Sequence, residues 1–324
     1  MNVKRPKRVG IITSGGDCPG MNSAIRACVR TAIYNGLEVY GFLKGYKGIL
    51  ENYFFPMTSR EVSGIMQKGG TILQTARCPQ LLELEYQKKA AENLRNLGID
   101  GMIVIGGDGS LKGAMALEKQ GIPCVGIPGS IDNDIPYTDM AIGVDTALNT
   151  ILWATDAIKD TATSHDRAFV IEVMGRNCGY LAVASGIIAG AEYTIIPEFP
   201  FDIEKMVNSL KKRYEEGRSN ALIIVAEGAA SASKIAEQLK DRIGFEVRVS
   251  ILGHIQRGGS PTAFDRLLAS RLGRAAVENI IEGKHNVMVG LIKSQIVATP
   301  LNLVTETKKK LDRDFFSLAL MMGI

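Results

Sequence analysis

Residues 101–110 read GMIVIGGDGS, and the fold of the chain follows from this stretch and from the repetition of its pattern. The first half is a continuous run of apolar residues, which is typical of a parallel strand buried on both faces. The second half is a glycine-rich loop with one aspartate, and a helical segment that carries Lys112 follows it. A strand that runs into such a loop and then into a helix predicts an α/β unit whose loop approaches an anion.

The same pattern recurs along the whole chain. Strands are expected at residues 8–13, 37–42, 101–105, 123–127, 168–173, 193–196, 221–226, 246–252 and 287–292. Amphipathic segments lie between them. Gly36 should end the first helix, a capping box at residues 58–61 predicts another, and Ser260 with Pro261 predicts the start of one over 262–282. We therefore expect an α/β fold with mainly parallel sheets flanked by helices.

Composition narrows the class of protein. The 324 residues are 46% hydrophobic and 22% charged, which is ordinary for a globular protein of about two domains. The net charge of +4 is weak, so nucleic acid is not an expected partner.

The sequence also bears on where the protein works. The apolar run at 9–12 is too short for a secretory leader and no stretch would span a membrane, so we expect a cytoplasmic protein. Five scattered cysteines predict reduced thiols.

Four further glycine-containing loops follow expected strands, and in parallel sheets ligands bind beyond such strand ends. They are residues 13–20 (TSGGDCPG), 128–134 (PGSIDND), 173–179 (VMGRNCG) and 253–261 (GHIQRGGSP). Glycines let a backbone approach an anion, and the 106–110 loop adds Asp108 as an oxygen ligand for Mg²⁺ and Ser110 as a helix cap or phosphate contact. That loop is neither a dinucleotide fingerprint nor a P-loop, because no GK[ST] follows it.

The charged side chains of these loops suit phosphoryl transfer. Asp132 and Asp134 could act as a base and as an orienting group, and Arg176 can clamp a phosphoryl group. His254 and Arg257 flank a glycine turn that could bind an anion. Taken one at a time, the loops also fit ordinary tight turns, and residues 128–134 alone fit a solvated turn slightly better than a catalytic loop.

Together the five motifs resemble bacterial 6-phosphofructokinases, in the order found in that family and over almost the whole chain. GGDGS alone also occurs in NAD kinases and lipid kinases, whereas PGSIDND with GHIQRGGSP is specific. The resemblance implies a two-domain, phosphofructokinase-like fold and a homotetramer with sites shared between subunits. A larger ATP-binding domain would span 1–143 plus 255–305, and a smaller fructose 6-phosphate-binding domain would span 144–254 plus 306–324.

The implied reaction is phosphorylation of fructose 6-phosphate at its 1-hydroxyl by MgATP, giving fructose 1,6-bisphosphate and ADP in the committed step of glycolysis. Asp132 would be the base, Asp134 would support the metal–phosphate geometry, and Arg176 would neutralise the transferring phosphoryl group. Ser130 stands where the family usually has threonine, so its hydroxyl is kept. The implied nucleotide side consists of Gly16, Arg77, Cys78, Gly107, Asp108, Gly109 and Ser110, with Asp108 serving Mg²⁺.

The implied sugar side draws on both halves of the chain. It consists of Ser130, Ile131, Asp132, Met174, Gly175, Arg176, Glu227, His254 and Arg257, joined by Arg167 and Arg248 from a neighbouring subunit.

The family's effector site, which takes a nucleoside diphosphate or phosphoenolpyruvate, is matched only in part. The matching set is Arg26, Arg30, Gly190, Glu192 and Arg218, with Lys159 in place of an arginine. Ser59 stands for another arginine and Glu216 for a lysine. With two cationic groups lost, at Ser59 and Glu216, and an acid added, the effector should bind more weakly or be a different compound.

Three other kinds of protein share part of these motifs. Pyrophosphate-dependent relatives tend to carry aspartate at position 109 and lysine at 129, where this chain has Gly109 and Gly129. An NAD kinase would explain residues 106–110 but neither 128–134 nor 253–261. A non-catalytic nucleotide-sensing subunit should lack the base, the metal ligand or the phosphate arginine, all of which are present.

Overall fold

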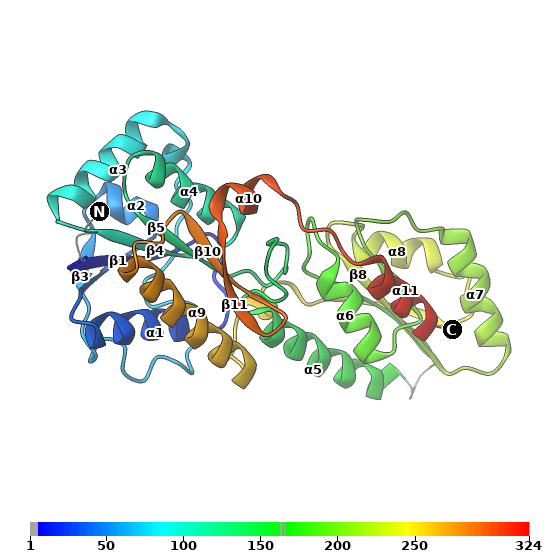
Figure 1. Cartoon of the computed structure of the whole chain (residues 1–324). Coiled ribbons are helices and arrows are strands. Elements are labelled where there is room, and N and C mark those ends of the chain that lie inside the picture. The colour runs from blue at the N-terminus through cyan, green and yellow to red at the C-terminus, as the bar shows by residue number, and fades with distance from the viewer. Residues whose placement is uncertain (1–5, 163, 165, 324) are drawn as a thin grey trace. The chain divides into compact units, whose positions relative to one another are not determined.

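The computed structural model describes residues 6–162, 164 and 166–323. Its contacts divide the chain into two compact units (Figure 1). Unit 1 comprises Met1–Ile131, Ile135–Thr146 and Arg257–Lys309, and unit 2 comprises Asp132–Asp134, Ala147–Gln256 and Lys310–Ile324. Within the described residues, no helix has the length and apolarity needed to cross a bilayer.

Unit 1 is built on a seven-stranded sheet in the order β11-β10-β5-β4-β1-β2-β3. All pairs inside the sheet are parallel, and only the outermost pairs, β10 with β11 and β2 with β3, are antiparallel. The central strands are completely buried, as continuous apolar runs require. The strands are β1 (Arg8–Ser14), β2 (Glu38–Phe42), β3 (Phe54–Pro56), β4 (Gly101–Gly106), β5 (Cys124–Pro128), β10 (Val287–Ile292) and β11 (Gln295–Pro300).

Helices cover this sheet, and α1 packs along α9 (Figure 1). The close approach depends on Gly273, where an added Cβ would lie 2.7 Å from the Cβ of Ala27. Gly36 has a φ of 79° directly after the C-cap of α1, which confirms the expected end of that helix. The helices are α1 (Met21–Tyr34), α2 (Tyr46–Leu50), α3 (Leu84–Asn96), α4 (Asp108–Lys119), α9 (Ala263–Ile281) and α10 (Leu301–Glu306), with a 3₁₀ turn η1 (Pro79–Leu82).

Unit 2 is built on a four-stranded, wholly parallel sheet in the order β7-β8-β6-β9. Its core contains Val170, Leu210, Ile223 and Phe245. The strands are β6 (Arg167–Val173), β7 (Tyr193–Ile195), β8 (Asn220–Ala226) and β9 (Glu246–Ile251). The helices are α5 (Val144–Ala162), α6 (Tyr180–Ala189), α7 (Ile203–Glu215), α8 (Ala232–Leu239) and α11 (Arg313–Met322), with a 3₁₀ turn η2 (Gly253–Arg257). The first three residues of α5 and the last residue of η2 belong to unit 1.

The predicted α/β class with mainly parallel sheets is confirmed, and each of the nine expected strands is present with its ends shifted by at most one residue. Two antiparallel edge strands, β3 and β11, were missed. β3 has only three residues and ends in Pro56. β11 follows β10 through Lys293 and Ser294, which both have positive φ (48° and 67°) and form a tight hairpin without the usual asparagine or glycine.

Two predicted helix starts were wrong. The capping box forms, since Glu61 accepts a hydrogen bond from the Thr58 amide at 2.8 Å, but residues 58–64 make only turns because Gly64 leaves the helical region with a φ of 62°. In α9 the N-cap is Thr262 and not Ser260. The Thr262 hydroxyl accepts the amide hydrogen of Asp265 at 3.3 Å.

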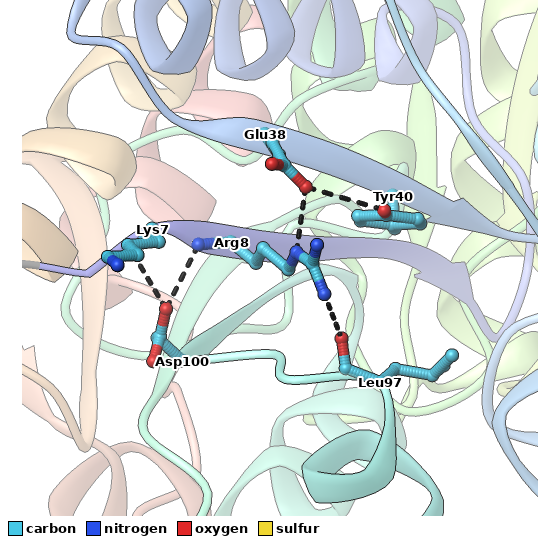
Figure 2. A network of polar contacts seen from close by, with 6 residues as sticks. All are labelled: Lys7, Arg8, Glu38, Tyr40, Leu97 and Asp100. Atoms are coloured by element: carbon cyan, nitrogen blue, oxygen red, sulfur yellow. Dashed lines mark hydrogen bonds and ion pairs between the residues drawn. The ribbon is translucent and has the colours of Figure 1, made fainter.

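The amino end of β1 is fixed by a polar network (Figure 2). The Asp100 carboxylate accepts the backbone amides of Lys7 and Arg8 at 2.7 and 3.0 Å. The Arg8 guanidinium donates to Glu38 of β2 at 2.7 Å and to the carbonyl of Leu97 at 3.0 Å. These bonds tie β1 to both neighbouring strands at the end opposite to the glycine-rich loops.

Candidate active site

The sheet of unit 1 reverses its direction of winding between β1 and β4. From β1 the chain passes to β2 on one side, while β4 and β5 lie on the other side. At such a switch point the loops after two adjacent parallel strands diverge and leave a crevice at their carboxyl ends. Here they are residues 15–20 after β1, and Gly107 with the first turn of α4 after β4.

Backbone contacts bring the glycine-rich loops together. The amide of Gly129, after β5, donates to the carbonyl of Gly106 at 3.0 Å. A Cβ on Gly106 would collide with the carbonyl oxygen of Ser14, and one on Gly16 would collide with the guanidinium of Arg257. The loops after β1, β4 and β5 and the segment at Arg257 therefore share one edge of unit 1, and they fit together because side chains are missing there.

A fifth segment, residues 66–78, is fastened to the same edge. The Thr13 hydroxyl donates to the carbonyl of Gln74 at 2.8 Å. The Asn22 side chain donates to the carbonyl of Lys68 at 3.1 Å and accepts the amide of Ile72 at 2.8 Å. Sequence reasoning missed Asn22, which is buried at the start of α1 and closes this loop. Arg77, at the end of the segment, is exposed.

Two helices begin at this edge without a side-chain cap. The N-cap positions of α1 and α4 are Gly20 and Gly107, and in the described structure no side chain hydrogen-bonds to either helix start. Backbone carbonyls already accept two of these amides, since Met21 donates to Cys18 at 3.4 Å and Ser110 to Gly107 at 2.9 Å. The amides of Asp108 and Gly109 at the start of α4 are the best placed for an anion, with the positive end of the helix dipole behind them.

The residues around the start of α4 leave an open approach. A Cβ on Gly109 would find no atom within 4 Å, and one on Gly107 would touch only the Gly129 carbonyl at 3.9 Å. The Asp108 carboxylate, half exposed, accepts a hydrogen bond from Lys112 at 2.7 Å. Ser110 does not cap α4, as one reading of the sequence had it. It lies inside the helix, and its hydroxyl is buried without a hydrogen-bond partner among the described residues.

The donor set suits a magnesium ion that arrives with a nucleotide. Within the described part of the chain, no three acidic, histidine or cysteine side chains gather into a metal site. Protein-bound Mg²⁺ commonly uses one or two carboxylates and completes its shell with water and substrate phosphates. Asp108 offers one carboxylate beside the uncapped start of α4.

The loop that carries Asp132 leaves the same edge through a short parallel bridge between Gly129 and Ile142. The Ser130 amide donates to the Ile142 carbonyl at 3.2 Å. Asp132 is half-buried, with its Oδ1 atom shielded from solvent. Asn133, next to it, is completely buried and has a φ of 51°. The loop is therefore a fixed element of the fold and not a solvated turn.

In unit 2 the loops after β6, β8 and β9 meet in the same way. The amide of Gly228 donates to the carbonyl of Gly175 at 3.3 Å, and a Cβ on Gly228 would collide with the carbonyl of Arg176. The amide of Met174 donates to the side chain of Gln256 at 3.2 Å. The structure thus brings Met174, Gly175, Arg176 and Glu227 together at the carboxyl ends of adjacent strands, with His254 beginning the segment after β9.

Comparison with known proteins decides the family. The Phosphofructokinase profile matches residues 8–280, which is most of the chain. The chain belongs to the phosphofructokinase family.

Curated relatives in the phosphofructokinase family match over their full length. The chain is 51% identical to the ATP-dependent 6-phosphofructokinase of Halalkalibacterium halodurans over 98% of this chain and 100% of that protein. It is 48% identical to the ATP-dependent 6-phosphofructokinase of Bacillus subtilis over the same shares.

Solved phosphofructokinase structures have the same fold as this chain. The Pichia pastoris phosphofructokinase in the T-state has a TM-score of 0.89 at 38% identity, over 94% of this chain and 36% of that longer chain. A pyrophosphate-dependent phosphofructokinase from Marinobacter aquaeolei has a TM-score of 0.85 at 23% identity, over 97% of this chain and 91% of that one. This second likeness concerns the fold alone.

Two predicted sugar-phosphate residues of this phosphofructokinase lie away from the others. Arg167 is the first residue of β6, whereas Met174 follows its last residue. At about 3.3 Å per residue the strand separates these ends by roughly 20 Å. Arg167 donates to Glu246 at 2.8 Å, and Arg248 on the edge strand β9 pairs with the same carboxylate. Arg167 is therefore far from the loops at the carboxyl end of its own sheet, and Arg248 lies in the middle of β9.

Part of the predicted effector set lies together in unit 2. The Lys159 ammonium donates to the carbonyl of Ala189 at 2.8 Å and would stand 3.9 Å from a Cβ on Gly190. Glu192 accepts the amide of Leu222 at 2.6 Å. Arg213, which sequence reasoning did not include, lies 4.0 Å from Glu192 with most of its side chain buried.

The remaining predicted effector residues are distributed differently. Arg26 and Arg30 are on α1 of unit 1, and Arg218 is exposed after α7 of unit 2. Glu216 forms an ion pair with Lys212 at 3.7 Å. Neither unit alone assembles the complete set.

Proposed function

We propose that the chain is an ATP-dependent 6-phosphofructokinase, which transfers the γ-phosphoryl group of MgATP to the 1-hydroxyl of fructose 6-phosphate. The observation that carries this proposal is the glycine-lined edge of unit 1 at the switch point of a parallel sheet, where two helices start without a side-chain cap and where the chain leaves through Ser130 toward Asp132. Full-length relatives that are about half identical carry that activity in their names.

In the proposed reaction the 1-hydroxyl oxygen bonds to the γ-phosphorus while the bond from that phosphorus to the bridging oxygen of ADP breaks. Asp132 receives the proton of the hydroxyl, and its half-buried position suits a base that must stay poorly solvated. Arg176 and Arg77 would neutralise charge on the transferring group, and Asp134 would support its geometry. Phosphoryl transfer depends mainly on such positioning and charge stabilisation.

Mg²⁺ would be held by Asp108 together with the nucleotide phosphates. When bound, the ion neutralises charge on those phosphates. Lys112 must then release or share the Asp108 oxygen that it contacts at 2.7 Å. The amides at the start of α4 and the Ser110 hydroxyl would complete the phosphate contacts.

The choice of ATP over pyrophosphate rests on Gly109 and Gly129. The space beside Gly109 is open, so nothing in the protein itself requires glycine there. A Cβ on Gly129 would lie 3.3 Å from Met21 and 3.5 Å from Cys18, so a lysine at that position would crowd the phosphate edge. Two glycines leave room for the larger donor.

The sugar's 6-phosphate would be bound across subunits. Glu227, His254 and Arg257 would contact the substrate from its own chain, while Arg167 and Arg248 would come from a neighbour because they lie at the far end of β6 and on its edge strand. We therefore propose a homotetramer with shared sites that works in the cytoplasm.

The deciding experiment supplies fructose 6-phosphate and Mg²⁺ with ATP or pyrophosphate in parallel and measures fructose 1,6-bisphosphate. Turnover with ATP alone is expected. Turnover with pyrophosphate alone would refute the donor and the role of the two glycines. Silence with both donors would favour a nucleotide-sensing subunit.

A further inference from the structure

Asp265 is a completely buried carboxylate in the first turn of α9. Its Oδ1 accepts the amide of Gly143 at 2.9 Å. Its Oδ2 accepts both the amide and the hydroxyl of Thr146, at 2.8 and 2.5 Å. One side chain of α9 therefore binds the start of α5, a helix from a distant part of the chain.

Thr146 and Thr262 close this contact from both sides. The amide of Thr262 donates to the Thr146 hydroxyl at 3.1 Å, and the Thr262 hydroxyl donates to Asp145 at 2.6 Å. The two helix starts are thus interlocked by side chains that all have defined partners. Cooperative networks of this kind hold a single geometry when every member is satisfied.

The interlocked segment leads directly to the predicted catalytic loop. The amide of Ile142 donates to the carbonyl of Pro128 at 3.0 Å, and its carbonyl accepts the amide of Ser130 at 3.2 Å. Gly143, with a φ of 100°, is tightly enclosed, since a Cβ there would lie 2.7 Å from the Cβ of Cys18 and 3.3 Å from Ile131. A shift of Gly143 would therefore displace Ser130 and Ile131, the two residues before Asp132.

Burying a charged carboxylate costs more free energy than a helix cap requires. A threonine or serine at the N-cap would satisfy one or two amides without burying a charge. In the described part of the chain no lysine or arginine forms an ion pair with Asp265, and Asp145 lies close by. Burial raises the pKa of Asp265, while the hydrogen bonds from Thr146 and Gly143 oppose this shift.

We propose that Asp265 is a positioning residue for the phosphoryl-transfer step, and that it holds the Ser130–Asp132 loop in place through Gly143 and Thr146. The proposal rests on the proposed function. It assigns Asp265 no contact with substrate, so its removal should lower turnover far more than it weakens binding.

A matched set of threonine variants tests this. Thr146→Val removes the hydroxyl link but keeps the backbone bond, and Thr146→Ser restores the hydroxyl. The control is Thr155→Val, because Thr155 lies on the same helix, is buried, and has a hydroxyl without a hydrogen-bond partner among the described residues.

We expect Thr146→Val to lower kcat on the order of 10–10²-fold while KM for both substrates changes little. Thr146→Ser and Thr155→Val should keep kcat. Equal kcat in Thr146→Val and wild type would overturn the proposal, and so would a loss in Thr146→Val that Thr146→Ser does not restore.

A double-mutant cycle that combines Asp265 with the proposed base, Asp132, then tests whether Asp265 affects turnover through that base. If Asp265 acts through Asp132, Asp265→Asn should lower kcat strongly in the wild type but little in an Asp132→Asn background. The same cycle with Thr146→Val serves if Asp265→Asn does not fold. Equal fold-losses in both backgrounds would refute action through the base. A wild-type protein without activity would refute the proposed function instead, and the two failures are therefore distinct.

Discussion

Several backbone positions at the candidate site are defined by an absent side chain. At Gly16 a Cβ would collide with Arg257, and at Gly228 it would collide with the carbonyl of Arg176. At Gly109 nothing would be hit. The first two glycines are therefore required by the protein's own packing, whereas the third leaves space that only a ligand can use.

Asp132→Asn tests the base. The substitution keeps the size of the side chain but removes its ability to accept a proton, so kcat should fall by about 10²–10⁴-fold while both substrates still bind. Steady-state kinetics and equilibrium binding of the nucleotide measure the two effects. Near-normal turnover would exclude Asp132 as the base.

Cys78 should be the first cysteine to react with a thiol reagent. Burial raises the pKa of its thiol, but Cys18, Cys28, Cys124 and Cys178 are buried and less accessible. If the loop that ends at Cys78 holds ATP, MgATP should slow the labelling. Mass spectrometry of digested protein measures this, with fructose 6-phosphate alone as the control. Labelling that ignores MgATP would remove Cys78 from the nucleotide side.

The strands and helices of unit 1 contribute to the candidate site through their ends. β1, β4 and β5 deliver loops, and α1 and α4 deliver helix starts without a side-chain cap. The opposite end of β1 is fastened by Arg8, Glu38 and Asp100, where the pKa of Arg8 is raised by its hydrogen bond to Glu38 (Figure 2). β1 thus has its amino end fixed by side-chain hydrogen bonds and its carboxyl end followed by a glycine-rich loop.

Gly109→Ala should separate stability from function. Alanine is favoured over glycine in a helix by roughly 0.5–1 kcal/mol, and no atom opposes the added methyl group. Thermal unfolding should therefore shift upward while KM for ATP rises. Calorimetry and kinetics on the same sample test this. A stabilised protein with an unchanged KM would show that the open space does not receive the nucleotide.

Much of the fold and most of the loop assembly could be predicted, because continuous apolar strands and the glycines after them are local signals. The hairpin through Lys293 and Ser294 carries no local signal, since neither residue type favours positive φ. Residues 58–61 gave a signal that Gly64 overrides. Asp265 and Gln256 were missed because their partners are far away in the sequence, and only the fold brings them together.

The proposed sugar-phosphate site would need an oligomer to complete it. Arg167 and Arg248 share Glu246 on one side of the sheet of unit 2, and Arg167 lies away from the loops that hold the other sugar-phosphate residues. Under the proposal, a single chain would bind nucleotide and still lack part of its sugar-phosphate contacts.

Oligomers that contain two different variants test directly whether one active site combines residues from two subunits. Asp132→Asn and Arg167→Ala should each be poorly active alone at limiting fructose 6-phosphate. Co-refolded hybrids should recover part of the activity, because some sites then combine an intact Asp132 with an intact Arg167 from the neighbour. Mixing without any recovery would place both residues in sites formed within one chain.

Regulation should differ from that of relatives with a full set of effector cations. Glu216 forms an ion pair with Lys212, and Ser59 supplies no charge. We expect phosphoenolpyruvate to change the fructose 6-phosphate saturation curve only weakly. Restoring charge with Ser59→Arg and Glu216→Lys should strengthen the response, which kinetics with and without phosphoenolpyruvate measures. A strong response in the unmodified protein would contradict this prediction.

The discontinuity of unit 1 has a consequence for biosynthesis. Its sheet needs β10 and β11, which are translated only after residues 147–256 of unit 2. Until then β5 has β4 on one side and an open, apolar edge on the other. A nascent chain on the ribosome therefore carries an unfinished sheet in unit 1 when the four-stranded sheet of unit 2 has already been translated, and unit 2 itself still lacks α11. Such exposed strand edges favour aggregation, so chaperone protection during late translation matters most for unit 1.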